Sequence, residues 1–238
     1  MNRPNLKDKA AIVTGAGRGI GRAIARRLAG SGAAVAAVAR TASEVNETRR
    51  LIESAGGQAL AVAADVTRES DVERLVQEAH EAFGRIDMLV NNAGIAPLAG
   101  IDDMTPATFD AILATNIRAV YLCSRAAWPH LAQAGGGAIV NMSSVASFDP
   151  FPGFAAYGAA KAFVNVYTKA LAAEGAPKDI RVYAVAPGAV ETTMLRERFP
   201  DFPRDKTLAP DDVAVLVESL LSPECRRESG QTITIRKD

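Results

Sequence analysis

A run of glycines directly after a short apolar segment is the feature that most restricts how this chain can fold. Residues 10–14 have the uninterrupted apolar character of a buried parallel strand. They lead into Gly15-Ala-Gly-Arg-Gly-Ile-Gly21, and Ile24 and Leu28 then lie four apart, as on one helix face. Glycines let backbone N–H groups approach a phosphate, and a helix amino terminus adds free donors and a favourable dipole. The segment is therefore predicted to be strand, turn and helix, with the turn as a diphosphate cradle.

The spacing of these glycines differs from that of two better-known phosphate loops. It is Gly15-x-x-x-Gly19-x-Gly21, and not the Gly-x-Gly-x-x-Gly of the common dinucleotide fingerprint. The Gly-Lys-Ser/Thr of a triphosphate loop is also missing. Because glycine clusters form plain turns as well, a phosphate cradle and a simple turn both stay open at this point.

Strand-like and helix-like stretches alternate along the rest of the chain. Further strands are expected over residues 34–38, 59–64, 86–90, 138–142, 181–186 and 231–235. Helices are expected over residues 43–55, 69–83 and 106–128, and from residue 155 onward. This alternation predicts an α/β fold with a single Rossmann-type, doubly wound parallel sheet of about seven strands flanked by helices. One domain is expected to span residues 1–238, with strand ends meeting at one ligand-binding edge.

The end of the second predicted strand indicates which dinucleotide would bind. At this place an acidic residue hydrogen-bonds the ribose of NAD, whereas an arginine can pair with the 2′-phosphate of NADP. The chain has Arg40 there and no acid, and Arg18 in the glycine turn could supply a second cation. NADP(H) is therefore favoured over NAD(H), although Arg40 could also be a solvated cation at a strand end.

Tyr157 and Lys161 lie four residues apart in a helix predicted to open near Ala155. Four residues return a helix to the same face, about 6 Å along its axis, so both side chains should face one pocket. A phenol with a pKa of about 10 gives up its proton poorly at neutral pH, but a nearby cation favours the phenolate. Tyr157 is thus a candidate proton carrier. A bare Tyr-x-x-x-Lys is more often an ordinary surface pair, so this assignment needs support from other residues.

Composition argues against several classes of function. Lysine plus arginine equals aspartate plus glutamate at 27 each, so no overall field attracts nucleic acid or an anionic membrane. Cys123 and Cys225 are too few for a disulfide framework or zinc site and are expected to be reduced, buried thiols. His80 and His130 have no partner at metal-ligand spacing, so they are interpreted as surface or helix-end residues and no metal is expected. The chain shows no signal core and no membrane-spanning run, which predicts a cytoplasmic protein.

The motifs together resemble the short-chain dehydrogenase/reductase family, and in particular its 3-oxoacyl-[acyl-carrier-protein] reductase-like members. The likeness covers essentially the whole chain, with every motif in the family's order. The matches are Thr14-Gly15-x-x-x-Gly19-x-Gly21, Asp65-Val66, Asn91-Asn92-Ala93-Gly94, Asn116, Ser144, Tyr157-x-x-x-Lys161 and Pro187-Gly188-x-Val190-x-Thr192. No single motif decides the matter, but their joint occurrence leaves little room for coincidence.

This resemblance implies an enzyme that interconverts a carbonyl and a secondary alcohol on a small or moderately apolar substrate by hydride transfer. By the same likeness, Tyr157 would donate the proton and Ser144 would hydrogen-bond the substrate oxygen. Lys161 would hold the nicotinamide ribose and lower the pKa of Tyr157. Asn116, which propensity alone places on an exposed helix, would seat a water linking Lys161 to solvent. The implied cofactor contacts are Gly15, Gly17, Arg18, Gly19, Ile20, Gly21, Arg40, Asp65, Val66, Asn92, Tyr157, Lys161, Val190 and Thr192.

The substrate side of the predicted site is less sharply defined. Phe148, Phe151 and Phe154 lie between the candidate serine and tyrosine, and they could wall an apolar pocket or simply pack in the core. Residues 193–209 fall where members of the family carry a substrate lid. The uncharged turn at 133–138 disfavours a substrate on a carrier protein, which would want a basic docking patch.

The expected oligomeric state also comes from the family likeness. The family likeness implies a homodimer or homotetramer built on the two long helices, although the Asp-Gly-Gly tail of many relatives is missing after residue 235. One alternative is a non-catalytic NADP(H)-binding sensor or scaffold, which would usually have lost a catalytic residue. The other is an NAD-preferring alcohol dehydrogenase of the same family.

Overall fold

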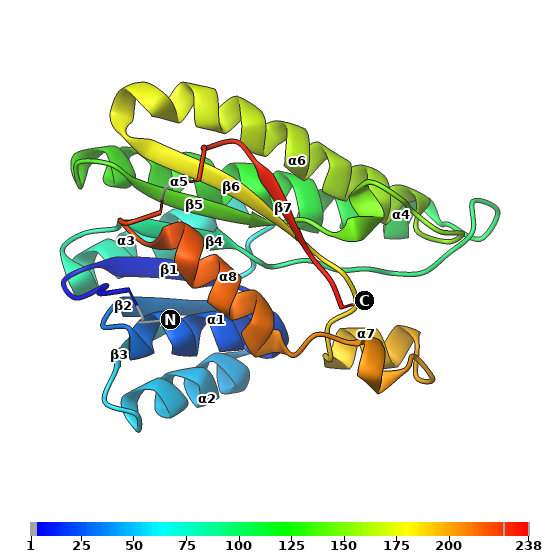
Figure 1. Cartoon of the computed structure of the whole chain (residues 1–238), viewed down its shortest axis with the longest axis horizontal. Helices are drawn as coiled ribbons and strands as arrows, with labels where there is room; N and C mark the ends of the chain where they lie inside the picture. Colours follow the sequence, from blue (N-terminus) through cyan, green and yellow to red (C-terminus); the bar gives the residue numbers. More distant parts are fainter. Residues whose placement is uncertain (1–3, 226, 238) are drawn as a thin grey trace.

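Seven parallel strands form the centre of the structure, a computed structural model that describes residues 4–225 and 227–237 (Figure 1). The strands are β1 (Ala10–Thr14), β2 (Ala34–Ala39), β3 (Gln58–Ala63), β4 (Met88–Asn91), β5 (Gly137–Met142), β6 (Ile180–Pro187) and β7 (Thr232–Ile235). Their order across the sheet is β3-β2-β1-β4-β5-β6-β7, and each neighbouring pair is parallel. The order reverses between β1 and β4, so a ligand crevice is expected where these two strands end. The predicted doubly wound sheet is confirmed.

Helices cover both faces of this sheet (Figure 1). One face carries α1 (Gly19–Gly30), α2 (Ala42–Glu53) and α8 (Pro210–Leu221), and the other carries α3 (Glu69–Phe83), α4 (Pro106–Leu113), α5 (Ala119–Gln133) and α6 (Ala155–Gly175). A short helix, α7 (Thr193–Arg198), and three 3₁₀ turns, Val145–Ser147, Ala176–Lys178 and Arg204–Lys206, lie in the connections. Because side chains alternate along a strand, Val13 packs with Leu28 and Val217 on the first face. Its neighbour Ile12 packs with Leu75 and Leu122 on the second.

The long helix predicted over residues 106–128 is interrupted. It consists of α4, one π-helical turn (Ala114–Arg118) and α5, which continues past the predicted end. Asn116 lies in the π turn and is fully buried, so the exposed position that its helix propensity favours is wrong. Its Nδ2 donates to the carbonyl of Ile95 (2.8 Å), and its Oδ1 accepts from the Ile95 N–H (3.1 Å). These two bonds fix the loop after β4, and π turns frequently occur at functional sites.

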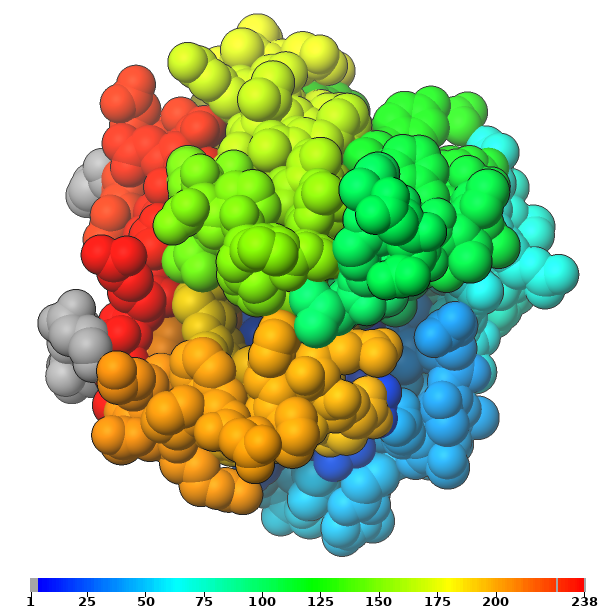
Figure 2. Space-filling model, turned by 90° about the vertical axis from the view of Figure 1, so that its right-hand side faces the viewer, coloured from blue at the N-terminus to red at the C-terminus, as the bar shows by residue number. Residues whose placement is uncertain are grey.

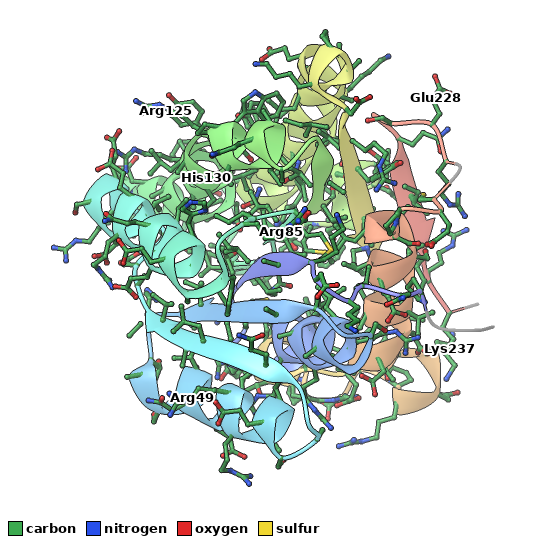
Figure 3. All side chains as sticks on the ribbon, turned by 90° about the vertical axis from the view of Figure 1, so that its left-hand side faces the viewer. Arg49, Arg85, Arg125, His130, Glu228 and Lys237 are labelled. Atoms are coloured by element: carbon green, nitrogen blue, oxygen red, sulfur yellow. The ribbon has the colours of Figure 1, made fainter. Side chains whose placement is uncertain are left out.

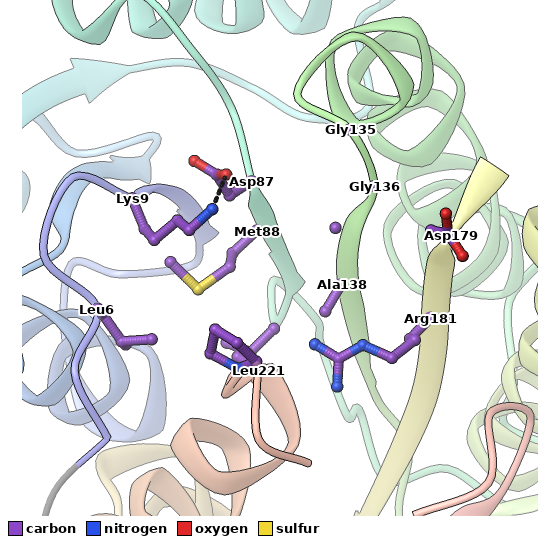
Figure 4. Close-up of a pocket in the computed structure, with 12 residues that line it drawn as sticks. Leu6, Lys9, Asp87, Met88, Gly135, Gly136, Ala138, Asp179, Arg181 and Leu221 are labelled. Atoms are coloured by element: carbon purple, nitrogen blue, oxygen red, sulfur yellow. Dashed lines mark hydrogen bonds and ion pairs between the residues drawn. The ribbon is translucent and has the colours of Figure 1, made fainter. Parts of the chain in front are cut away.

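Ion pairs hold together the edge of the sheet where the strands begin, which Figure 3 views. The Asp87 carboxylate is buried and lies 3.0 Å from Lys9 Nζ and 2.6 Å from an Arg85 nitrogen. It also accepts the Ala10 N–H at 3.0 Å. Although burial raises it, hydrogen bonds from Arg85, Ala10 and Lys9 bring the pKa of Asp87 below its ordinary value. Lys9 and Asp87 line a small cavity of about 210 Å³ at this edge (Figure 4).

His80 and His130 occupy the last turns of α3 and α5, so their predicted helix-end positions are confirmed, but each has a partner that spacing did not reveal. The two half-buried rings face each other, with centroids 4.6 Å apart and planes at 43°. Nδ1 of each ring is buried and has no hydrogen-bond partner among the described residues. Burial, and then repulsion by His80, lowers the pKa of His130.

The two cysteines differ in burial. Cys123 is a buried free thiol as predicted, whereas Cys225, also free, is only half-buried. Burial raises the pKa of Cys123 to about 12, so this thiol is inert at neutral pH. Within residues 4–225 and 227–237, no helix combines the length and apolar character that crossing a membrane requires.

Candidate active site

The carboxyl ends of the strands meet at the edge of the sheet that faces the viewer in Figure 2. There the chain after β6, including α7 (orange), lies across a hollow from the loops that follow β4 and β5 (green). The glycine turn follows β1, Asn92 follows β4, Ser144 follows β5 and Val190 follows β6. Arg40 and Asp65 follow the outer strands β2 and β3. The fold thus brings the sequence-predicted residues to one edge.

Two side chains hold the glycine turn against the end of β4. Thr14 Oγ1 donates to the carbonyl of Val90 (3.2 Å) and accepts the N–H groups of Asn92 (3.0 Å) and Ala93 (3.1 Å). Asn92 Nδ2 donates to the carbonyls of Thr14 (2.9 Å) and Gly15 (3.2 Å). Asn92, which the resemblance assigns to a ribose, therefore uses its amide to fix the turn at the β1–β4 crevice.

The turn itself tolerates only glycine at its closest approaches. A Cβ on Gly21 would lie 2.2 Å from the carbonyl oxygen of Gly15, and Gly19 has a φ of +54°. Arg18, the residue before α1, provides no side-chain cap, so the first N–H groups of the helix remain free to bind an anion. A bare backbone cradle at a helix amino terminus fits the diphosphate of a dinucleotide.

Charges near the adenosine end of this cradle are mixed. Arg40 is exposed and makes no ion pair with any described residue. Arg18 is also exposed, and its Nε lies 3.9 Å from Oε1 of Glu44. The Glu44 side chain lies next to Gly17, since a Cβ on Gly17 would be 2.8 Å from Glu44 Oε2. The two arginines favour an additional phosphate, whereas the carboxylate of Glu44 disfavours one.

Lys161 is buried without a carboxylate. Its Nζ donates to the carbonyl of Met142 (2.8 Å) and lies 5.7 Å from the centroid of the Tyr157 ring. No acidic side chain within the described residues forms an ion pair with it, and only 4% of Lys161 is exposed. Burial therefore lowers the pKa of Lys161 to about 8.

The pKa of Tyr157 is raised, so the net lowering expected from Lys161 is wrong. Burial of the phenol is the main cause, and a hydrogen bond with Ser144 acts in the opposite direction. The phenol therefore stays protonated at neutral pH. This is the form that can donate a proton to a carbonyl oxygen.

The two serines after β5, Ser143 and Ser144, have different partners. Ser144 precedes the 3₁₀ turn Val145–Ser147, accepts the Ala146 N–H (3.2 Å) and reaches Tyr157 with its hydroxyl. Ser143 is buried, and its Oγ donates to the backbone carbonyl of Lys161 at 3.2 Å. Ser144 is thus the serine beside the phenol, and Ser143 ties β5 to α6.

Asn116 and Lys161 both lie next to Gly94. A Cβ on Gly94 would lie 2.8 Å from Asn116 Oδ1 and 3.5 Å from Lys161 Nζ. The buried amide and the buried ammonium therefore face the same glycine. The structure places side by side the two residues that the resemblance assigns to a proton relay.

A row of buried polar side chains, which was not predicted from the sequence, lies beneath these residues. Asn91 Nδ2 donates to Asn141 Oδ1 (2.8 Å) and Ser124 Oγ (3.1 Å), and Asn141 Nδ2 donates to Thr168 Oγ1 (2.9 Å). All four residues are buried, and they join β4, β5, α5 and α6. The sequence shows only that two predicted strands each have an asparagine near their end. That Asn91 and Asn141 are neighbours becomes clear only from the register of β4 and β5.

A second missed contact anchors the segment after β6. Arg196 in α7 donates from Nε to Glu191 Oε1 at 2.8 Å, and Arg204 lies 3.6 Å from the same carboxylate. Hydrogen bonding from Arg196 lowers the pKa of Glu191 to about 2. Thr192 caps α7 and lies against Gly19, so this segment begins beside the glycine turn.

Aromatic rings connect α7 to the candidate tyrosine. Phe154 is buried, with its ring centroid 4.9 Å from that of Tyr157, 4.4 Å from Phe151 and 6.0 Å from Phe199. Phe148 and Phe151 are 61% and 45% exposed. Core packing therefore explains Phe154, and the other two rings remain available to a ligand.

The sheet and the cradle together define a nucleotide-binding protein with a Rossmann-type fold. The sequence profile of the short chain dehydrogenases matches residues 9–202, and the chain belongs to this short-chain dehydrogenase/reductase family. It is accordingly a dehydrogenase/reductase that acts on CH–OH groups.

Individual relatives cover nearly the whole chain. It is 38% identical to 3beta-hydroxysteroid dehydrogenase 1 of Eggerthella lenta, over 97% of this chain and 93% of that protein. The structure of 3-ketoacyl-(acyl-carrier-protein) reductase from Brucella melitensis in complex with NADH matches with a TM-score of 0.90 and 39% identity, over 97% of both chains. A 7 alpha-hydroxysteroid dehydrogenase complexed with NADH and 7-oxo glycochenodeoxycholic acid matches with a TM-score of 0.90 and 32% identity, over 97% of this chain and 94% of that one.

Proposed function

We propose that this enzyme is an NADP(H)-preferring reductase or dehydrogenase that interconverts a ketone and a secondary alcohol on a moderately apolar substrate. It would work as one domain over residues 1–238, with residues 193–209 as a substrate lid. The observation that carries the proposal is a protonated phenol, Tyr157, beside an ammonium, Lys161, that no carboxylate of the described residues neutralises. Such a pair suits proton donation rather than structural support.

Different residues would bind different parts of the cofactor. Gly15, Gly17, Gly19, Ile20 and Gly21 would hold the diphosphate. Arg18 and Arg40 would meet the 2′-phosphate, Asp65 and Val66 the adenine, Asn92 the adjoining ribose, and Val190 and Thr192 the nicotinamide end. When bound there, the nicotinamide supplies the hydride for reduction or accepts it in the reverse reaction.

The protein's own residues would provide the proton and the fixed charges. Ser144 would hold the substrate oxygen by a hydrogen bond while Tyr157 Oη donates its proton to that oxygen. The phenolate left behind is stabilised by the Lys161 ammonium, which is why an unpaired cation is useful there. Asn116 would hold a water that returns a proton from solvent by way of Lys161. Hydride plus proton balance the reduction of one carbonyl to one alcohol.

The rings at the mouth of the site favour a substrate with a broad apolar body. Phe148 and Phe151 expose large parts of their rings there, and Met194 in α7 is 40% exposed. Two relatives are named as hydroxysteroid dehydrogenases, and one of them is complexed with 7-oxo glycochenodeoxycholic acid. A cyclic or polycyclic ketone is therefore the first substrate class to examine.

The exposed face of the two long helices supports a homodimer or homotetramer. Val166 in α6 is 71% exposed, and Tyr121 of α5 and Phe163 of α6 are large exposed apolar residues on the same pair of helices. Apolar patches of this kind mark association surfaces. Sedimentation should show more than one subunit per particle, and a purely 25 kDa species at micromolar concentration would contradict the assembly.

The function is tested by absorbance at 340 nm with NADPH or NADH and a panel of cyclic ketones. We expect oxidation of the reduced cofactor with at least one ketone and a lower dissociation constant for NADPH than for NADH. Arg40→Ala should remove most of that preference, because it deletes a guanidinium suited to the 2′-phosphate. Tighter binding of NADH would reverse the cofactor assignment. Cofactor binding without any turnover would favour a sensor or scaffold.

A further inference from the structure

A groove of about 670 Å³ opens beside the candidate serine, at the end of the site nearest the C-terminal strand. Its walls come from the segment after β5, the backbone after β6 and the end of β7. The residues used below are Val145, Phe148, Asp149, Gly188, Ile235 and Arg236. Its volume lies within the range of about 300–1,000 Å³ that small-molecule sites occupy.

The parallel course of β7 explains why a cation ends up at this groove. Pro187 aligns with Ile235 in the β6–β7 register, and the Gly188 N–H donates to the Ile235 carbonyl at 2.8 Å. Because β7 runs in the same direction as β5 and β6, Arg236 emerges at the edge that also carries Ser144. A Cβ on Gly188 would lie 3.1 Å from Cβ of Arg236, so glycine lets the two backbones approach.

The charge of Arg236 is not used by the fold. Its side chain is exposed and forms no ion pair with any residue in the described part of the chain, including Asp149 in the same groove. Arginines elsewhere on this edge behave differently, since Arg196 and Arg204 both meet Glu191. Thr234 adds one polar wall, and the apolar part of the groove is formed by Val145, Ile235 and the exposed ring of Phe148.

We infer that this groove is a subsite for the anionic end of an amphipathic substrate whose carbonyl lies at Tyr157, with Arg236 as the residue that selects the anion. A guanidinium binds a carboxylate with two parallel hydrogen bonds, and the adjoining apolar walls suit the substrate body. Asp149 opposes the anion and limits the gain. The inference rests on the proposed function, because it places the reacting carbonyl at Tyr157.

Binding can be measured without turnover, using two compounds that lack a ketone. Calorimetry would compare 4-cyclohexylbenzoate with its neutral amide, 4-cyclohexylbenzamide, on the full chain saturated with oxidised cofactor. We expect the carboxylate to bind about tenfold more tightly than the amide, as one charge-assisted contact provides. Arg236→Gln should bring the ratio close to one, and Asp149→Asn should increase it. Lys237→Gln, which removes the neighbouring exposed cation, should leave the ratio unchanged.

The outcomes separate this inference from the function on which it rests. No preference for the carboxylate in the wild type, or a preference that survives Arg236→Gln, would overturn the subsite. Loss of the preference in Lys237→Gln as well would also overturn it, since only general electrostatic attraction would then remain. If the ratios follow expectation but 4-(4-oxocyclohexyl)benzoate and other ketones are never reduced, Arg236 is shown to bind an anion in this groove, while the proposed enzymatic function fails.

Discussion

Two lysines at opposite edges of the sheet show how the molecule separates stability from chemistry. Lys9, where the strands begin, is paired with a buried carboxylate that also binds Arg85. Lys161, where they end, is more deeply buried, yet it has only the carbonyl of Met142 as a hydrogen-bond partner among the described residues. A buried charge without a counter-charge costs free energy. The edge where Asp87 compensates the charges of Lys9 and Arg85 therefore supports the fold, and the edge that holds the uncompensated Lys161 carries the candidate active site.

Exchanging each lysine for methionine is the strongest way to break this comparison. Lys161→Met should lower kcat/KM by about 10³-fold, because the phenolate of Tyr157 would lose its stabilising charge. Lys9→Met should leave kcat/KM near the wild-type value. Steady-state kinetics at 340 nm with a substrate found in the ketone panel measures both. Equal losses in the two variants would show that the edges do not differ in this way.

The same comparison predicts opposite effects on stability. Asp87→Asn should lower the free energy of unfolding by about 2 kcal/mol, because charge-assisted hydrogen bonds to Lys9, Arg85 and the Ala10 N–H are lost. Lys161→Met should leave it unchanged or raise it, since an apolar chain of similar length replaces a buried amine. Urea unfolding without cofactor measures both values. Marked destabilisation by Lys161→Met would mean that this lysine also supports the fold.

The pH dependence of unfolding sharpens the difference. The pKa of Lys161 is lowered from 10.5 to about 8, so the folded chain binds fewer protons than the unfolded chain between these values. The wild type should therefore gain stability relative to Lys161→Met as pH rises from 8 towards 10.5. The pKa of Asp87 is lowered, so its contribution is complete above its ordinary pKa of 3.8 and is lost as pH falls below it. A flat difference between wild type and Lys161→Met over the alkaline window would contradict a buried, uncompensated ammonium.

The smallest expected effect concerns the paired histidines, which belong to neither edge group. The pKa of His130 is lowered by burial and by His80, so the folded state prefers the neutral ring and loses stability as pH falls below 6.5. The loss should be on the order of a few tenths of a kcal/mol because the ring is only half-buried. His80→Gln should reduce it, as followed by thermal unfolding between pH 7.5 and 5.5. An unchanged pH profile in this variant would argue against repulsion between the rings.

Much of the fold was predictable from local patterns. Apolar runs predicted most of the strands because parallel strands are buried on both faces, whereas β7 was predicted from an alternating Thr-Ile stretch, and the boundaries shifted by only a few residues. The π turn at Asn116 was not predictable, since it depends on hydrogen bonds to Ile95, a residue distant in sequence. The contact between His80 and His130 was hidden for the same reason.

The candidate site was predictable where a motif is continuous in sequence and less so where it is assembled from several segments. The positions of Tyr157 and Lys161 follow from helix periodicity. The direction of the Tyr157 pKa shift does not, because burial depends on the surrounding segments. A role for Arg236 could not be predicted from the sequence, because its position beside Gly188 depends on the pairing of β7 with β6.

The most direct test of the account is Tyr157→Phe, assayed for both turnover and cofactor binding. We expect kcat to fall by about 10³-fold, because the ring remains and only the transferable proton is lost. The dissociation constant of NADPH should change far less. Turnover close to the wild-type rate would contradict the account, since the proton would then have to come from another group.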